Sequence, residues 1–334
     1  MKSHSFANAM ACTGAVVGAG FASGREITAF FSRYGVHGWW LIAAASALMT
    51  GLCSVCMRET VRCSAKCWCE LYEDEKPWLK GAAQICAVLL LILTAGAMIA
   101  ASGQMAALML NRRKAYVIGA AGTLFAAWLL GYGSMKPLGW LSGILIVLFL
   151  AAIAAGLTVS GSQIIQTAVQ DSLLTAAVRA IGYASMNMTL AIGVVSRCAS
   201  RDDGQNLKTA FAFGTIMFVM MGFSHCLYSK HPEWLSESFP LVRIVAGFGR
   251  TGFLLSALLV YLSVFTSLTA VIYALRCAVE EHVQSTVIRF FAVILLPALV
   301  SCIGFSQIVD RFYAPAGLLC LFVVFYPLFR RRKA

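Results

Sequence analysis

Residues 14–26 read Gly-Ala-Val-Val-Gly-Ala-Gly-Phe-Ala-Ser-Gly-Arg-Glu, and this stretch decides the fold class. It lies in an apolar segment near the amino end, yet it holds four glycines and ends on a charged pair. Glycine weakens a helix, and backbone groups released from a helix are costly in hydrocarbon unless protein, water or a ligand satisfies them. In a membrane, the stretch therefore predicts a broken helix beside a cavity. The alternative is that Gly14, Gly18 and Gly20 form a small-residue face for close helix packing.

The composition indicates a membrane protein. Of the 334 residues, 60% are hydrophobic and 12% are charged, against roughly 45 to 50% apolar and about 25% charged residues in soluble domains. A transmembrane helix needs about 20 apolar residues, so the chain has room for about ten spans and little else. The excess of 26 Lys and Arg over 14 Asp and Glu is typical of cytoplasmic loops. The expected partner is therefore the lipid bilayer, and no nucleic acid is expected.

Apolar segments separated by polar residues predict an all-α polytopic membrane protein with ten transmembrane helices in a single domain, residues 1–334. A charged loop covers residues 59–79. More Lys and Arg fall on the side of the amino terminus than on the other side, which predicts that this loop and both termini are cytoplasmic. The expected helices cover residues 7–32, 36–58, 80–109, 115–132, 137–159, 173–197, 208–228, 250–278, 285–305 and 311–329.

A second irregular stretch lies about half a chain after the first. Residues 181–193 combine two glycines with hydroxyl and amide side chains inside an apolar segment, which predicts that helix 6 is broken like helix 1. The two sets of five segments then match in spacing, as repeat one over about 7–160 and repeat two over about 173–330. An odd number of spans in each half places the halves in opposite orientations, which is the 5+5 inverted repeat of many secondary transporters.

Glu26 is the acidic residue that lies inside an apolar segment, whereas the other acids lie in loops or at predicted helix ends. A charged side chain at the centre of a span costs roughly 2.5 to 3.5 kcal/mol, so an intramembrane acid predicts a functional site. Three roles stay open. In the first, Glu26 has a structural role, because it pairs with Arg25 or caps a half-helix. In the second, it couples transport to a proton or a cation. In the third, it contacts the substrate directly.

The run Gly18-Ala-Gly-Phe-Ala-Ser-Gly-Arg-Glu26, followed by Phe30-Phe31 and Gly35, resembles the YkvI-type bacterial membrane proteins. These are a branch of the amino acid-polyamine-organocation transporters with the LeuT fold. The resemblance implies that helices 1, 2, 6 and 7 move against a scaffold of helices 3, 4, 8 and 9. It further implies an ion- or proton-coupled secondary transporter of a small solute, an amino acid or a related compound, in the bacterial inner membrane. No enzyme activity is expected.

The same resemblance implies a sodium site. LeuT-type symporters hold an ion between carbonyls before the break of helix 1 and hydroxyls on helix 8, where this chain has a Ser-x-x-Thr-Ser run. Hydroxyls at i, i+3 and i+4 share one helix face, and hard oxygen ligands suit a hard cation. The alternative is that these hydroxyls bond to carbonyls one turn earlier. The expected ion-binding residues are Gly14, Val17, Ser263, Thr266 and Ser267.

Substrate contacts are expected at both predicted breaks. The backbone amides of Ala19 and Gly20 could receive a carboxylate, and polar side chains of helix 6 could supply further contacts. Phe21 stands where well-studied sodium symporters have a polar residue, which argues against a second sodium ion. The expected substrate-binding residues are Ala19, Gly20, Phe21, Gly24, Glu26, Tyr183, Ser185 and Asn187.

Two other functions stay open. Met186 and Met188 carry soft thioethers that suit transition metals, although the first break lacks the Asp and Asn of metal transporters of this fold. A nutrient-sensing receptor that binds a solute without net transport fits the same sequence. No cofactor is expected apart from Na⁺ or H⁺ as coupling ion, and the sequence does not predict the oligomeric state.

The cysteines near the charged loop allow a regulatory zinc or thiol site. Cys53 and Cys56 have the C-x-x-C spacing, and Cys63, Cys67 and Cys69 follow. A closed zinc site usually pairs two such units, and the second group does not match that spacing. Incidental small residues are therefore the favoured interpretation.

Overall fold

A computed structural model describes residues 5–65, 68–73, 75–131, 136–159, 172–280 and 283–330, with the backbone alone at 69, 136–139 and 159. All regular secondary structure in the described chain is helical. Among these residues, seven helices are long and apolar enough to cross a membrane, and two shorter apolar helices, Ala115–Leu130 and Thr286–Ser301, accompany them. The seven are Ser32–Arg62, Pro77–Leu110, Trp140–Thr158, Leu173–Arg197, Asp203–Tyr228, Pro240–Glu280 and Phe305–Arg330.

The first apolar segment consists of three helices, α1 (Ser5–Val16), α2 (Ala19–Ser23) and α3 (Arg25–Phe30). Residues 17 and 18 separate α1 from α2. Gly24 joins α2 to α3 with φ +84°, which a residue with a side chain rarely adopts. A Cβ atom at this position would also overlap the Tyr228 hydroxyl. Gly18 and Gly24 therefore mark the two points where the helix is interrupted, whereas Gly14 and Gly20 lie inside α1 and α2.

Longer helices make up most of the remaining chain. Short 3₁₀ turns precede α4, α5 and α10, and π-helical turns interrupt the last two apolar segments. The longer helices are α4 (Gly38–Arg62), α5 (Pro77–Leu110), α6 (Ala115–Leu130), α7 (Lys136–Val159), α8 (Leu173–Arg197), α9 (Asp203–Tyr228) and α11 (Gly249–Glu280). The shorter ones are α10 (Pro240–Val245), α12 (Thr286–Phe290), α13 (Leu296–Ser301), α14 (Phe305–Gln307), α15 (Tyr313–Cys320) and α16 (Tyr326–Arg330).

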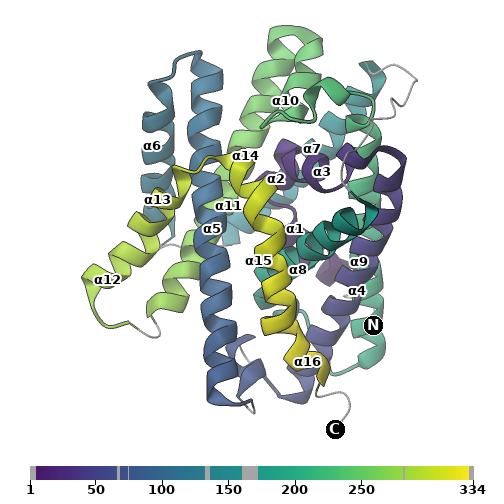
Figure 1. Ribbon diagram of the computed structural model, residues 1–334, viewed down its shortest axis with the longest axis vertical. Helices are drawn as coiled ribbons and strands as arrows, with labels where there is room; N and C mark the ends of the chain where they lie inside the picture. Colours follow the sequence, from purple (N-terminus) through teal and green to yellow (C-terminus); the bar gives the residue numbers. More distant parts are fainter. Residues whose placement is uncertain are drawn as a thin grey trace.

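The helices form two groups that pack closely within themselves. In one group, α4 packs against α8 and α9, and α1 packs against α8 and α9. In the other, α5 packs against α6, α11 and α13. The short helices α2 and α3 lie among the long ones, and α10 lies at the end of the molecule opposite to α16 (Figure 1). The short helices α2 and α3 therefore connect the two groups, because α2 packs against α11 and α3 packs against α8 and α9.

Large apolar side chains cover the outside of the helix bundle. Trp40, Ile118 and Phe322 are at least two-thirds exposed, at 75%, 74% and 67%. A soluble monomer rarely carries so much apolar surface, whereas lipid-facing helices require it. The chain is a multi-pass membrane protein.

The prediction that helix 6 is broken is wrong in this structure, because α8 runs without interruption from Leu173 to Arg197. The side chains of Ser185, Asn187 and Thr189 each donate a hydrogen bond to the carbonyl four residues earlier, at 2.9 to 3.0 Å. They are therefore satisfied within the helix.

The glycine at the start of this stretch has a packing role. A Cβ atom on Gly182 would overlap the Ala314 carbonyl, and one on Gly317 would overlap the Gly182 carbonyl. Gly182 and Gly317 thus allow the backbones of α8 and α15 to approach closely, as small residues do in membrane helix pairs. Close packing, rather than unwinding, explains this glycine.

Candidate functional site

A cavity of about 360 Å³ lies beside the interruption between α1 and α2. One end is lined by buried side chains, among them Glu26, Asn187 and Tyr313. The other end is lined by Val194 and Arg197, which are exposed. The cavity therefore opens at the carboxyl end of α8 and is closed at the end where α3 begins.

The structure brings many of the expected site residues to this cavity and leaves others outside its lining. Phe21 instead packs edge-on against Phe149, with ring centroids 5.4 Å apart. Ser185 donates its hydroxyl to the Ile181 carbonyl. The expected residues on the cavity wall are Gly14, Val17, Ala19, Gly20, Glu26, Asn187, Thr266 and Ser267, and those off it are Phe21, Gly24, Tyr183, Ser185 and Ser263.

The interruption changes the hydrogen bonding of the backbone at the cavity. The Gly18 amide donates to the Val16 carbonyl at 2.9 Å, two residues back, and the Ala19 amide donates to the Ser267 hydroxyl at 3.1 Å. In a continuous helix, these two amides would donate to Gly14 and Ala15. The carbonyls of Gly14 and Ala15 therefore lose their helical donors and become available to a ligand.

A second, smaller cavity lies between this backbone and α11. It has about 10 Å³ and is lined by Val17, Ser263, Thr266 and Ser267, among others. That is close to the volume that one water molecule requires. The Ser263 and Thr266 hydroxyls donate to carbonyls one turn earlier, as the alternative interpretation expected. The lone pairs of these hydroxyl oxygens stay free to accept a hydrogen bond or to bind a cation.

Glu26 lies at the start of α3, is 6% exposed, and turns its carboxyl group onto Gly20. A Cβ atom on Gly20 would overlap that carboxyl group, so the position requires glycine. The hydroxyl of Tyr183 on α8 is buried as well and makes no hydrogen bond within the described part of the chain. Among the described residues, no cation forms a salt bridge with Glu26. The interpretation in which Arg25 pairs with Glu26 is therefore wrong.

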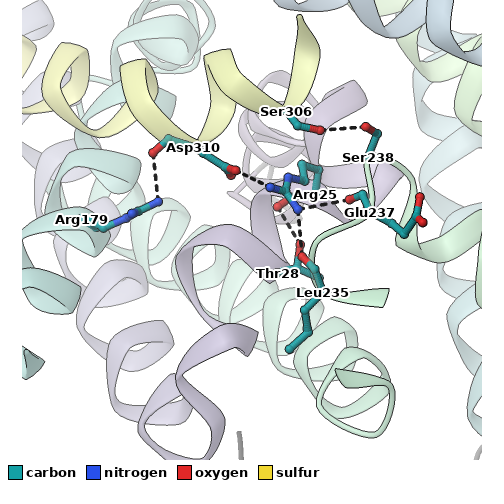
Figure 2. Close-up of polar contacts among 8 residues, drawn as sticks. All are labelled: Arg25, Thr28, Arg179, Leu235, Glu237, Ser238, Ser306 and Asp310. Atoms are coloured by element: carbon teal, nitrogen blue, oxygen red, sulfur yellow. Dashed lines mark hydrogen bonds and ion pairs between the residues drawn. The ribbon is translucent and has the colours of Figure 1, made fainter. Parts of the chain in front are cut away.

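Arg25 is held instead by groups far away in the sequence (Figure 2). Its guanidinium forms an ion pair with Asp310, and it donates to the carbonyls of Leu235 at 2.8 Å and Glu237 at 3.2 Å. These contacts join α3 to the π-helical turn after α14 and to the segment before α10. They form a layer across the closed end of the cavity.

Asp310 is a residue near the buried end of the cavity that the sequence did not indicate, as are the lining residues Thr94 and Tyr313. It stands one residue before the expected tenth segment, whereas the structure places it inside the helical run Phe305–Arg330. Arg179 of α8 donates to the Asp310 carbonyl at 3.1 Å (Figure 2). The Arg179 guanidinium also lies 5.5 Å from the ring centre of Phe30. A charged residue next to an apolar segment was the available signal.

Three aromatic rings pack together beside Arg179, the residue that bonds the Asp310 carbonyl. The Tyr183 ring lies 5.0 Å from Phe30 and 5.2 Å from Phe31, measured between ring centroids. All three rings are fully buried. None of these rings lines the cavity; they pack behind the lining residue Glu26.

The cysteines do not form a metal site within the part of the chain that the structure describes. Cys53 and Cys56 are buried within α4. Cys67 lies outside the described residues, as does the side chain of Cys69. Among described residues, no group of three or more His, Cys, Asp or Glu side chains is arranged to hold a metal ion.

Comparisons with known proteins agree with this architecture. No family model matches the chain. It is 25% identical over 318 residues to YkvI, an uncharacterised membrane protein of Bacillus subtilis strain 168, covering 92% of this chain and 90% of that protein. The chain is therefore similar to YkvI over nearly its whole length.

Two solved structures share the fold. A mutant of the manganese transporter of Eremococcus coleocola matches with a TM-score of 0.65 at 14% identity, covering 95% of this chain and 77% of that one. MhsT in complex with L-phenylalanine matches with a TM-score of 0.62 at 17% identity, covering 97% and 86%. These likenesses show that the chain has the fold of LeuT-type transporters.

Proposed function

We propose that this membrane protein is a secondary active transporter that moves a small solute, an amino acid or a related compound, by alternating access. One observation carries the proposal. A cavity beside the interrupted first helix is open at Val194 and Arg197 and closed at the other end by the Arg25–Asp310 pair. A binding site that is reached from one side only is what alternating access requires in each of its end states.

The opposite state needs the closed end to open. The contacts of Arg25 join α3 to Asp310 and to carbonyls near α10, so separating these elements would expose the buried end of the cavity. The two packed groups of helices supply bodies that can move against each other. The excess of positive charge on the side of loop 59–79 supports a cytoplasmic position for the present mouth. The bacterial inner membrane, with both termini cytoplasmic, is the proposed location.

We also propose that the chain spans the membrane ten times as a 5+5 inverted repeat. The seven long apolar helices, the two shorter ones and the interrupted first segment would together make ten spans. The π-helical turns in the last two segments keep those segments helical across their length. Repeat one would cover about 7–160 and repeat two about 173–330, within one membrane domain.

Coupling to an ion has two proposed sites. Sodium would bind between the carbonyls of Gly14 and Val17 and the hydroxyls of α11, where the freed carbonyl of Gly14 and the 10 Å³ cavity support it. A proton would bind Glu26, which is buried and lacks a salt bridge among the described residues. The α11 residues are Ser263, Thr266 and Ser267.

Transition-metal transport is a second candidate. The thioether of Met186 and the carboxyl of Glu26 line the same cavity, and thioether and carboxylate ligands can both bind metal ions. The shared fold includes a manganese transporter. If the transported species is a transition metal, added Mn²⁺ should displace it from the cavity. If it is an organic solute, its binding should not require any metal.

Ligand binding with and without sodium tests the proposal. Purified protein in detergent is screened for solutes that raise the melting temperature, since a bound ligand stabilises the folded state by mass action. Sodium is expected to increase the stabilisation by the true solute. If sodium does not change the stabilisation by the solute, the proposed sodium site is refuted and the proton remains as the proposed coupling ion. A ligand that binds without ever accumulating in proteoliposomes would identify a receptor instead.

A further inference from the structure

A groove of about 310 Å³ lies between α4, α9 and α16, and it shares no lining residue with the central cavity. α16 packs against α4 at the end of the molecule opposite to α10 (Figure 1). Among the residues that line the groove, Gly51, Arg58 and Phe211 are exposed. The groove therefore opens on the outside of the helix bundle, where the protein meets lipid.

The groove has a charged end and an apolar end. Arg58 and Glu59 line it close to the carboxyl end of α4, whereas Ala47 lines it deeper in the same helix. At 1.5 Å of rise per residue, Glu59 and Ala47 lie about 18 Å apart along the helix axis. One leaflet contributes half of the hydrocarbon core of a bilayer, which is roughly 15 Å. The groove thus has the depth of one leaflet, with its charges at the membrane surface.

Basic side chains gather at the charged end. Arg58 is exposed and forms no salt bridge to the described part of the chain. Lys208 follows the lining residue Leu207, Arg330 follows the lining residue Phe329, and both cations are exposed. Three cations on three different helices therefore surround the surface end of the groove.

The acids near this end do not neutralise these cations. Glu59 is buried and pairs with Arg62 at 3.3 Å. Asp202 accepts a hydrogen bond from the Gly204 amide at the start of α9. Asp203 lies one turn before Leu207 and offsets one positive charge. An excess of positive charge remains, which an anionic group would balance.

Gly51 keeps the apolar part of the groove open. A Cβ atom on Gly51 would meet nothing within 4 Å, whereas one on Gly214 of α9 would overlap the hydroxyl of Thr50 on α4. The two helices are therefore in close contact beside the groove, and their packing does not use the space at Gly51. An acyl chain is as apolar as the leucine and phenylalanine side chains on the groove wall and fits this space.

The charged end favours an anionic lipid over a neutral occupant. A neutral lipid or an apolar helix of a second copy of the chain would cover Arg58 without supplying a counter-charge, which is costly away from water. A phosphate group can instead accept two parallel hydrogen bonds from an arginine side chain. A phospholipid also supplies the acyl chain that the apolar end accommodates.

We propose that the groove between α4, α9 and α16 binds one anionic phospholipid, with its phosphate at Arg58 and an acyl chain along Gly51. Basic pockets between membrane helices bind anionic lipid headgroups by the same chemistry. The lipid belongs to the leaflet on the side of loop 59–79. This site lies apart from the solute cavity and does not depend on the solute or on its transport.

Lipid titration followed by native mass spectrometry tests the proposal. Full-length protein in an uncharged detergent receives phosphatidylglycerol or phosphatidylcholine with identical acyl chains, and glycerol phosphate serves as a headgroup without chains. One phosphatidylglycerol per chain is expected to bind at least about fivefold more tightly than phosphatidylcholine, the effect of one basic residue near a membrane surface. Glycerol phosphate should not displace it. Equal affinity for the two lipids, displacement by glycerol phosphate, or a dimer that excludes the lipid would overturn the proposal.

A charge variant tests the position of the phosphate. Arg58→Gln should weaken phosphatidylglycerol binding roughly fivefold and leave phosphatidylcholine binding unchanged. Arg250→Gln is the matched control, because Arg250 is also exposed and lies on α11, outside the lining of this groove. An unchanged preference for phosphatidylglycerol in Arg58→Gln would contradict the assignment.

A steric variant tests the position of the acyl chain. Gly51→Leu should weaken phosphatidylglycerol binding several-fold, because the leucine side chain would occupy the space of the acyl chain. Gly122→Leu on α6 is its control, because a Cβ atom there also meets nothing within 4 Å. The melting temperature without lipid checks that both variants fold. Lipid binding that Gly51→Leu reduces no more than Gly122→Leu does would show that the chain does not lie in this groove.

Discussion

Arg25 and Glu26 are neighbours in the sequence, yet the fold gives them separate roles. Arg25 reaches Asp310, 285 residues away, and closes one end of the cavity. Glu26 turns onto Gly20 and faces the cavity itself. Sequence reasoning could find Glu26, because one acid inside an apolar segment is visible in a single stretch. It could not find the partner of Arg25, because that pairing depends on how distant helices pack.

Replacing Glu26 tests its place in the mechanism. Glu26→Gln keeps the shape and removes the charge, so we expect folding to be preserved and transport to be abolished or uncoupled from its driving ion. Melting temperature in detergent measures the first effect, and uptake into proteoliposomes at several pH values measures the second. Wild-type uptake with an unchanged pH dependence would take Glu26 out of the mechanism.

The Arg25–Asp310 pair is expected to act as one unit. Arg25→Gln and Asp310→Asn should each reduce uptake, and the double variant should be no worse than the more damaging single one, because groups in one ion pair are not independent. The coupling energy from this cycle, measured on uptake rates, should therefore exceed about 0.5 kcal/mol. Additive losses in the double variant would show that the pair does not work as a unit.

At the scale of the elements, two similar sequence patterns have different structures. The stretch at residues 14–26 interrupts its helix, because glycines coincide with a positive φ at Gly24 and with a carboxyl group packed on Gly20. The stretch at 181–193 stays helical, because its polar side chains bond within α8 and Gly182 faces α15. Glycine content alone could not separate these cases, since the deciding partner of Gly182 lies on another helix.

The close packing of α8 on α15 predicts that adding a single methyl group at their contact destabilises the folded protein. Gly317→Ala would place a Cβ atom on the Gly182 carbonyl, so we expect a loss of about 1 to 3 kcal/mol in stability from overpacking. Thermal unfolding in detergent measures it. Gly122→Ala on α6 is the control, because a Cβ there meets nothing within 4 Å, and it should be neutral or slightly stabilising. Equal effects of the two changes would argue against the close contact.

The hydroxyl face of α11 predicts which variants lose sodium dependence. Thr266→Val removes an oxygen from the small cavity without touching the Ala19 amide, whereas Ser267→Ala also removes the acceptor of that amide. We expect both variants to weaken the stabilisation by sodium, and Ser267→Ala to lower the melting temperature without sodium as well. Thermal shift across a sodium series measures both effects. Sodium stabilisation that persists in Thr266→Val would count against the site.

At the scale of the whole molecule, composition and segment spacing predicted an all-helical membrane protein, and the structure and its likeness to LeuT-type transporters agree. The closed and open ends of the cavity could not be predicted, because they arise from contacts between α3, α10 and the turn after α14. The pattern of apolar segments indicates which parts can cross the membrane. It does not determine which face of the central cavity is open.

Net transport against a gradient is the central claim, and accumulation in proteoliposomes measures it. Vesicles containing the protein are given the radiolabelled ligand found by thermal shift, first with an inward sodium or proton gradient and then with that gradient collapsed by an ionophore. The proposed mechanism predicts accumulation above the external concentration with the gradient, equilibration without it, and no accumulation with Glu26→Gln. A ligand that binds wild-type protein but never exceeds its external concentration under either gradient would contradict it and identify a receptor.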